Sequence, residues 1–425
     1  MAAAFLPTAT GLFCGSRVTG TVGAPCPSAL RPAPPPSLAF FPRRAATANG
    51  GVDAAAAAAA AARRAPLRAS VAAPPPPAPL LPVPAAATHR ATRGLRGVRP
   101  IHTALITGAS GGIGAETVAA LGQLYPDLRC LVVAVRDTEK ARARLLGSDG
   151  ELAANPRLAA ATVLVQVELE SVASAVAAAE EAVAALDRVA GCGLDLFVAN
   201  AGVMACPQAV TEDGFEKQMA INHLSHAAMT RTLLPALRAG GTSADGTAAG
   251  PGRAVFVSST AALIASRYTA LPLPNVRTAP TAAPFTSYKR WVQYGESKLA
   301  NAVWAAGLAA REAAAATGVT AVSVHPGVVA TELGRYLLPG WLAGRMGTPP
   351  AGLAARAVKV AGLKTPPEGA VTSVRAAVAG ADALDNGAYY IDGNVKSGML
   401  KMLGDPAAVG AFYDETLAAL DAVSA

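Results

Sequence analysis

Short apolar runs alternate with longer segments in which apolar residues recur every three or four positions along residues 101–425. The short runs are typical of buried parallel strands, and the longer segments are typical of helices. Strands that alternate with helices predict right-handed crossovers and a doubly wound parallel sheet of about seven strands in one α/β domain. The predicted strands are residues 103–107, 130–135, 163–167, 196–199, 254–257, 320–324 and 388–391.

Polar clusters follow several of these predicted strands. Asn200-Ala-Gly202 comes after the strand at 196–199, Ser258-Ser259 after 254–257, and His325-Pro-Gly327 after 320–324. Ligands of doubly wound sheets bind beyond the carboxyl ends of the strands. The sequence therefore predicts a site at this edge of the sheet.

A glycine-rich loop stands between the first predicted strand and the helix that follows it. Gly108, Gly112 and Gly114 have the spacing G-x-x-x-G-x-G. Glycines at such a turn let the backbone approach a pyrophosphate, whose charge is stabilised at the helix N-terminus. A glycine loop alone also fits a purely structural turn, but its place at the start of the domain favours a Rossmann-type nucleotide site.

The end of the second predicted strand bears on the choice of cofactor. In NAD-binding sheets an acid near this point holds the ribose 2′-hydroxyl, whereas an arginine accommodates a 2′-phosphate. Here the strand ends at Val135-Arg136, and the first acid is Asp137. This pattern favours NADP(H), with a solvated surface arginine as the alternative.

A tyrosine and a lysine are placed for proton transfer. Tyr294 and Lys298 are four residues apart, so they lie on one face of a helix, and no other tyrosine of the chain has a lysine at that spacing. A nearby cation lowers the pKa of a phenol, which predicts a tyrosine that exchanges a proton with a carbonyl or an alcohol. The pair by itself is a weak signal.

Composition divides the chain into two parts. Residues 1–100 contain eleven of the 36 Lys+Arg residues, all of them arginine, and one of the 28 acids, so their net charge is +10. The remaining residues have a net charge of −2, and the two parts sum to +8. They also contain 17 of the 33 prolines and nine consecutive alanines at 54–62. The basic charge therefore belongs to a leader and does not indicate a nucleic-acid-binding surface.

This leader is predicted to be disordered, because it buries too little apolar area to offset its ordering entropy. We expect residues 1–98 to be a transit peptide and a proline/alanine-rich linker, and residues 99–425 to fold. A low-complexity tail without a targeting function is the alternative. The sequence contains no secretory h-region or membrane span, and its five cysteines lack the spacing of disulfide frameworks or metal sites.

Taken in order, these motifs resemble those of the classical short-chain dehydrogenases/reductases across essentially all of residues 101–425. Asn200-Ala-Gly-Val-Met204, Tyr294-Gly-Glu-Ser-Lys298 and His325-Pro-Gly327 resemble the retinol dehydrogenase-like branch. That branch includes a dehydrogenase of the plastid envelope translocon, and light-dependent protochlorophyllide reductases are its neighbours. The resemblance thus implies a plastid location, with the mitochondrion as the alternative.

The resemblance also implies roles for individual residues. Tyr294 would be the general acid/base, Lys298 would lower its pKa and hold the nicotinamide ribose, Ser259 would orient the substrate oxygen, and Asn222 would support the proton relay. The residues implied to bind NADP(H) are Gly108, Ser110, Gly112, Ile113, Gly114, Arg136, Glu168, Leu169, Asn200, Ala201, Gly202, Tyr294, Lys298, Pro326, Gly327, Val329 and Thr331. Two positions depart from the family pattern: Glu168 replaces its usual aspartate, and Ala199 replaces its first asparagine.

The function implied is an NADP(H)-dependent oxidoreductase that acts on a carbonyl or alcohol of a lipophilic small molecule. The alternatives are a light-dependent protochlorophyllide reductase and a redox-sensing NADP-binding adaptor at the plastid envelope. The apolar segment 337–344 would cover such a substrate, contact a membrane surface or simply pack, and the segment 268–290 would shape access to the site. A homo-oligomer is compatible with this function. His223, His226 and His325 lack ligand partners at a useful spacing, so we expect them to have structural roles and expect no metal site.

Overall fold

The structure is a computed structural model of the chain. Its described residues form one eight-stranded sheet in the order β3-β2-β1-β4-β5-β6-β7-β8, parallel except for the antiparallel pair β7–β8. The strands are β1 Thr103–Thr107, β2 Cys130–Val135, β3 Thr162–Gln166, β4 Leu196–Ala199, β5 Arg253–Val257, β6 Thr320–His325, β7 Tyr389–Ile391 and β8 Asn394–Val395. The described residues are 85–95, 97–190, 193–242, 245–265, 271, 273, 288–331, 333 and 363–424.

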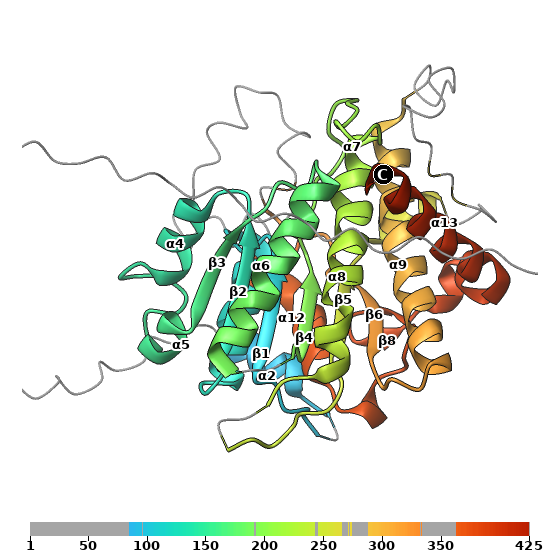
Figure 1. Ribbon diagram of the computed structural model, residues 1–425. Helices are drawn as coiled ribbons and strands as arrows, with labels where there is room; N and C mark the ends of the chain where they lie inside the picture. Colours follow the sequence, from blue (N-terminus) through green and yellow to red (C-terminus); the bar gives the residue numbers. More distant parts are fainter. Residues whose placement is uncertain are drawn as a thin grey trace, which may run out of the picture. The chain divides into compact units, whose positions relative to one another are not determined.

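Helices cover both faces of the sheet, as the strand–helix alternation predicted. In Figure 1, α6, α8 and α9 lie in front of the sheet, and α12 and α2 lie behind it. The helices are α2 Ala85–Thr92, α3 Gly112–Leu124, α4 Thr138–Leu146, α5 Pro156–Ala160, α6 Val172–Ala190, α7 Lys217–Met219, the π-helix η1 Ala220–Leu224, α8 Ser225–Ala239, the 3₁₀ helix η2 Thr260–Ile264, α9 Arg290–Ala314, α12 Pro366–Val378, the 3₁₀ turns η4 Ala381–Ala383, η5 Ser397–Met399 and η6 Lys401–Gly404, and α13 Pro406–Ser424.

Alternate residues of each central strand enter opposite layers of the core. Phe197 and Phe256 pack edge to face, with ring centres 6.2 Å apart, in the layer beneath α6, α8 and α9. Val198 and Val255 point into the other layer, beneath α3 and α12. Because side chains of a strand alternate between faces, an apolar run is buried on both sides of the sheet. The predicted doubly wound sheet is confirmed.

The last strand was not predicted. β8 pairs with β7 through a two-residue turn at Asp392 and Gly393, whose φ angles are 50° and 78°. Asp-Gly is a typical dipeptide for such a turn, so the sequence contained a signal for this hairpin. The two-residue strand that follows has no hydrophobic alternation to mark it.

Helix α2 begins before the predicted boundary at residue 99. Ala91 is buried, and Arg375 of α12 donates hydrogen bonds to the carbonyl oxygens of Ala91 and Arg93, at 3.2 and 2.8 Å. The Thr88 hydroxyl donates to Gln123 of α3. An average composition does not reveal one short helix that docks on a core. The prediction for residues 1–84 falls outside the described residues.

Three features of the described part of the chain bear on the kind of protein. No helix there is long and apolar enough to cross a bilayer. No group of three or more His, Cys, Asp or Glu side chains there is arranged to hold a metal ion. Cys130 and Cys206 are buried, and burial raises the pKa of the Cys206 thiol above its ordinary value.

Candidate active site

The glycine loop joins β1 to α3 and packs directly on the turn that follows β4. Gly108 has a φ angle of 71°, and a Cβ atom there would lie 2.8 Å from Cα of Ala201. A Cβ atom at Gly114 would lie 2.6 Å from Nδ2 of Asn200. Larger residues at these two positions would separate the two segments, and at Gly108 the positive φ angle also favours glycine.

Hydrogen bonds fix the Asn200-Ala-Gly202 turn against the end of β1. The Thr107 hydroxyl oxygen accepts from the backbone N–H groups of Asn200 and Ala201, at 3.0 and 2.9 Å. The Asn200 side-chain amide donates in return to the Thr107 carbonyl oxygen at 2.8 Å. The order of the sheet places β1 beside β4, and this pairing brings two predicted segments more than 90 positions apart in sequence into one site.

The N-cap residue of α3 is Gly111. An added Cβ atom there would meet no atom of the described residues within 4 Å, and no described side chain caps the helix. A helix N-terminus without a capping side chain presents backbone N–H groups and a positive dipole end. The residues present therefore fit a pyrophosphate.

The ends of β2 and β3 lie on the other side of β1 from β4 and β5. Arg136 and Glu168 are exposed there, whereas Leu169 is buried. The Asp137 carboxylate accepts from the backbone N–H of Lys140 at 2.8 Å and caps α4. The carboxylate of the acid nearest the end of β2 thus caps a helix, and Arg136 is the exposed charged group that directly follows this strand.

Asn222 lies in the π-helix η1 and is completely buried. Its side-chain oxygen accepts from the Val203 N–H at 2.8 Å, and its amide donates to the Val203 carbonyl and the Ser297 hydroxyl, at 3.0 and 2.9 Å. The Ser297 hydroxyl donates to the Tyr294 carbonyl oxygen. These bonds tie η1 to the turn after β4 and to α9.

Ser259, Tyr294 and Lys298 complete the cluster. Ser259 caps η2, and its hydroxyl oxygen accepts from the Ala261 N–H at 3.1 Å. Lys298 lies one turn after Tyr294 on α9, and its Nζ donates to the Val257 carbonyl oxygen at the end of β5, at 2.9 Å. Val257 and Ser259 belong to the same strand end, so β5 places the serine and anchors the lysine.

Gly202 separates Asn222 from Lys298. A Cβ atom at Gly202 would lie 2.9 Å from Oδ1 of Asn222 and 3.4 Å from Nζ of Lys298. The turn after β4 therefore touches two of the side chains expected to take part in proton transfer. A glycine is needed here because an added methyl group would displace an asparagine whose hydrogen bonds are already made.

Burial dominates the electrostatics of this cluster. It lowers the pKa of Lys298 to about 7 and raises the pKa of Tyr294 to about 12, although the Ser259 side chain acts against the second shift through a hydrogen bond. The lysine was expected to lower the pKa of the phenol below its ordinary value. In this structure the pKa of Tyr294 instead lies above that value, because the phenol is almost fully removed from solvent.

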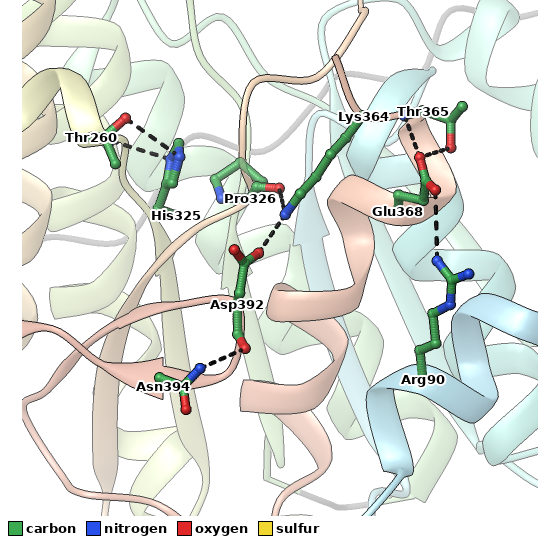
Figure 2. Close-up of polar contacts among 9 residues, drawn as sticks. All are labelled: Arg90, Thr260, His325, Pro326, Lys364, Thr365, Glu368, Asp392 and Asn394. Carbon is green, nitrogen blue, oxygen red and sulfur yellow. Dashed lines mark hydrogen bonds and ion pairs between the residues drawn. The ribbon is translucent and has the colours of Figure 1, made fainter. Parts of the chain in front are cut away.

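The segment after β6 lies against the glycine loop. The Thr331 methyl carbon would be 3.2 Å from a Cβ atom at Gly112, and Val329 packs on Gly369 beside Ile113. Figure 2 shows Lys364 donating to the Pro326 carbonyl oxygen and pairing with Asp392. Gly327 has a φ angle of 94°. Lys364 thereby holds the Pro326-Gly327 turn in place.

His325 supports the serine segment from the neighbouring strand. Its Nδ1 accepts from the backbone N–H of Thr260 at 3.2 Å, and its Nε2 lies 3.4 Å from the Thr260 hydroxyl (Figure 2). Burial lowers the pKa of His325 to about 4, so the ring is neutral near pH 7. This scaffold role agrees with the sequence-based expectation.

Comparison with known proteins agrees with this geometry. The family model "short chain dehydrogenase" matches residues 102–270. Mouse retinol dehydrogenase 14 is 32% identical over 287 residues, which cover 64% of this chain and 72% of that protein. Mouse polyprenol dehydrogenase is 32% identical over 281 residues, covering 66% and 72%. Human retinol dehydrogenase 12 is 32% identical over 294 residues, covering 69% and 78%.

The chain is a short-chain dehydrogenase. It is therefore an oxidoreductase, and its relatives place it in the retinol dehydrogenase-like branch of the family, as the motifs indicated. Among solved structures, an NADPH-bound carbonyl reductase from chicken fatty liver is similar, with a TM-score of 0.47 and 22% identity over 70% of this chain and 99% of that one.

Two sets of the residues predicted for this short-chain dehydrogenase lie apart from each other. Asn222, Ser259, Tyr294 and Lys298 lie together, whereas Arg136, Glu168 and Leu169 lie on the β2–β3 side of the sheet. The predicted access segments 268–290 and 337–344 lie outside the described residues, except for Leu271, Leu273, Tyr288, Lys289 and Arg290.

Sequence reasoning missed several residues that hold the site together. Thr107 and Ser297 were present inside quoted motifs but were given no role, and His226 was assigned only to the scaffold. Lys364 carried no signal, because its partner Asp392 is 28 positions away and belongs to no motif. Side chains that fix motifs in place are visible only once the strands are assembled.

Proposed function

We propose that this short-chain dehydrogenase is an NADP(H)-dependent oxidoreductase that interconverts a carbonyl and an alcohol on a lipophilic small molecule. The proposal rests on one observation: the side chains of Asn222, Ser259, Tyr294 and Lys298 lie together beside the glycine loop. The helix that follows this loop has no side-chain hydrogen bond at its N-cap. NADP(H), when bound, supplies the hydride for reduction or accepts it in oxidation.

The protein's own residues handle the proton and the oxygen atom. In the reduction direction, the Tyr294 phenol donates its proton to the substrate oxygen as the carbonyl carbon gains hydride, and the alcohol results. In oxidation, the phenolate accepts that proton. Ser259, which hydrogen-bonds Tyr294, orients the same oxygen. Lys298 in its cationic form favours the phenolate, and Asn222 holds the turn that borders both groups.

The preference for NADP(H) over NAD(H) rests on the corner formed by β2 and β3. An NAD site uses a free carboxylate at the end of β2, but the Asp137 carboxylate caps α4. Arg136 is exposed at this strand end, where its guanidinium would meet a 2′-phosphate. Gly108, Ser110, Gly112, Ile113 and Gly114 would hold the pyrophosphate, and the segment from Pro326 to Thr331 would face the nicotinamide.

A lipophilic substrate is supported by two observations. The relatives are named for retinol and polyprenol, both long apolar alcohols. In addition, Trp291 is 45% exposed and lies edge-on to the ring of Tyr294, with ring centres 6.0 Å apart. An exposed indole beside the reacting phenol provides an apolar contact for the chain or ring next to the substrate oxygen.

The test is NADPH oxidation by the full-length protein, in darkness and under illumination. Retinal and a polyprenal represent lipophilic carbonyls, acetaldehyde a small polar one, and protochlorophyllide the light-dependent alternative. We expect dark turnover of the lipophilic aldehydes. Strictly light-dependent turnover of protochlorophyllide would instead establish the reductase, and NADPH binding without turnover of any compound would establish the adaptor.

We also propose that the protein is imported into plastids. The support is the leader, whose arginine-rich, acid-poor composition is typical of transit peptides. A fluorescent reporter that carries residues 1–84 should accumulate in chloroplasts. Accumulation in mitochondria would show the alternative organelle, and a cytosolic reporter would show that the leader has no targeting function.

A further inference from the structure

His226 of α8 is buried between two segments of the site. Its Nε2 lies 2.9 Å from the Thr107 hydroxyl oxygen, and its Nδ1 lies 3.1 Å from the carbonyl oxygen of Asn222. The side chain is 1% exposed. One imidazole ring therefore spans from the end of β1, where the glycine loop begins, to the residue expected to support the proton relay.

The surrounding hydrogen bonds determine the tautomer of this ring. The Thr107 hydroxyl oxygen already accepts from the N–H groups of Asn200 and Ala201, so it has only its own proton left to offer. It donates that proton to Nε2 of His226. Nδ1 then carries the ring proton and donates to the Asn222 carbonyl oxygen, which cannot itself donate.

A charged ring does not fit this arrangement. Protonation of Nε2 would direct an N–H group at a hydroxyl oxygen whose acceptor positions are filled. Burial and the nearby Lys298 charge also lower the pKa of His226, to about 4. The ring is thus a neutral connector with a defined direction: backbone N–H groups to Thr107, Thr107 to His226, and His226 to Asn222.

We propose that His226 is a positioning residue that couples the cofactor-binding turn to Asn222. Through Thr107 it fixes the Asn200-Ala-Gly202 turn, and through the Asn222 carbonyl it fixes the π-helix that carries the Asn222 side chain. This inference rests on the function proposed above. His223 offers a contrast, since its Nε2 contacts Thr416 of α13 and its ring packs on Phe412 and Trp304, outside the site.

Two half-substitutions separate the two connections. The amide of His226→Asn reaches the position of Nδ1 and keeps the bond to Asn222, whereas the amide of His226→Gln reaches the position of Nε2 and keeps the bond to Thr107. We expect His226→Asn to weaken NADPH binding, measured by fluorescence titration, and His226→Gln to lower kcat. Each loss should be about 5- to 100-fold, as for a buried polar group left without its partner.

The matched control is His223→Gln, which should lower the melting temperature without changing kcat or NADPH affinity. If both His226 variants likewise lose only thermal stability, the residue is merely structural and the inference is overturned. A double variant, His226→Gln with Asn222→Ala, should lose no more kcat than Asn222→Ala alone. If Asn222→Ala keeps the wild-type kcat, the role proposed for Asn222 in proton transfer is wrong, although the hydrogen bonds of His226 would still stand.

The tautomer of His226 can also be measured in the wild-type protein, so this test does not depend on whether a variant folds. In the ¹⁵N NMR spectrum of histidine-labelled protein, the His226 ring should show a protonated Nδ1 and an unprotonated Nε2 from pH 5 to 8. A ring protonated at Nε2, or one that titrates near pH 6.5, would contradict the proposed direction of the chain.

Discussion

Nζ of Lys298 lies 5.9 Å from the centre of the Tyr294 ring and donates its hydrogen bond to the Val257 carbonyl oxygen. Both side chains are almost completely buried. The lysine therefore has a fixed position beside the phenol, held by a backbone carbonyl, and burial lowers its pKa to about 7. Four predictions test this cluster and the adjoining cofactor corner.

Tyr294→Phe removes the transferable proton and leaves the ring in place. Turnover should fall by about 10²–10⁴-fold, the range for general acid/base catalysis, while NADPH affinity and melting temperature change little. Tyr125→Phe is the control, because the Tyr125 hydroxyl donates to the Arg99 carbonyl outside the site. A Tyr294→Phe protein that keeps more than about a tenth of the wild-type rate would show that another group moves the proton.

Lys298→Met should abolish most turnover and yet stabilise the fold at neutral pH. The unfolded lysine binds its proton below its ordinary pKa of 10.5, but the folded one does so only below about 7, so the wild-type protein loses stability as pH falls from about 10.5 to 7. The methionine variant has no such loss. Its gain should be on the order of 1–3 kcal/mol, reduced by the lost bond to Val257.

The check is urea denaturation of both proteins between pH 6 and 10. The difference in free energy of unfolding should be largest at pH 7 and below, and it should shrink toward pH 10. A difference that does not depend on pH would mean that the pKa of Lys298 in the folded protein stays near its ordinary value.

Gly202→Ala should impair turnover, because its methyl group would press on Asn222 and Lys298. We expect kcat to fall about 10-fold or more, in keeping with the effect of a small misplacement of catalytic groups. Gly410→Ala in α13 is the matched control, since a Cβ atom there meets no atom of the described residues within 4 Å. Alanine should stabilise that helix by about 0.5–1 kcal/mol and leave kcat unchanged.

Arg136→Ala should weaken NADPH binding by about 1–3 kcal/mol, the range for hydrogen bonds to charged groups. NADH binding should stay nearly unchanged, because NADH lacks the 2′-phosphate. Arg142→Ala is the control on α4, where Arg142 is also solvent-exposed and pairs with Glu139. Isothermal titration with both cofactors is the measurement, and equal losses for NADPH and NADH would make Arg136 an ordinary surface residue.

The sequence by itself determined the elements and the edge at which the site lies. Buried parallel strands must be continuously apolar, so the runs at β1, β2 and β4 were visible to within a residue. Carboxyl ends of parallel strands share one edge, which placed the Asn-Ala-Gly turn, Ser259 and the Pro-Gly turn there without any coordinates. The Tyr294–Lys298 pair followed from helical spacing alone.

Only the tertiary structure decided how these segments are held and what their charges do. Burial depends on everything packed around a group, so the helical spacing that paired Tyr294 with Lys298 could not show that both pKa values shift in favour of the uncharged form. The bonds from His226 to Thr107 and from Lys364 to Asp392 join residues far apart in sequence, and no periodicity records such pairs. Composition likewise did not reveal α2, because docking on α12 depends on the shape of one surface and not on an average over the leader.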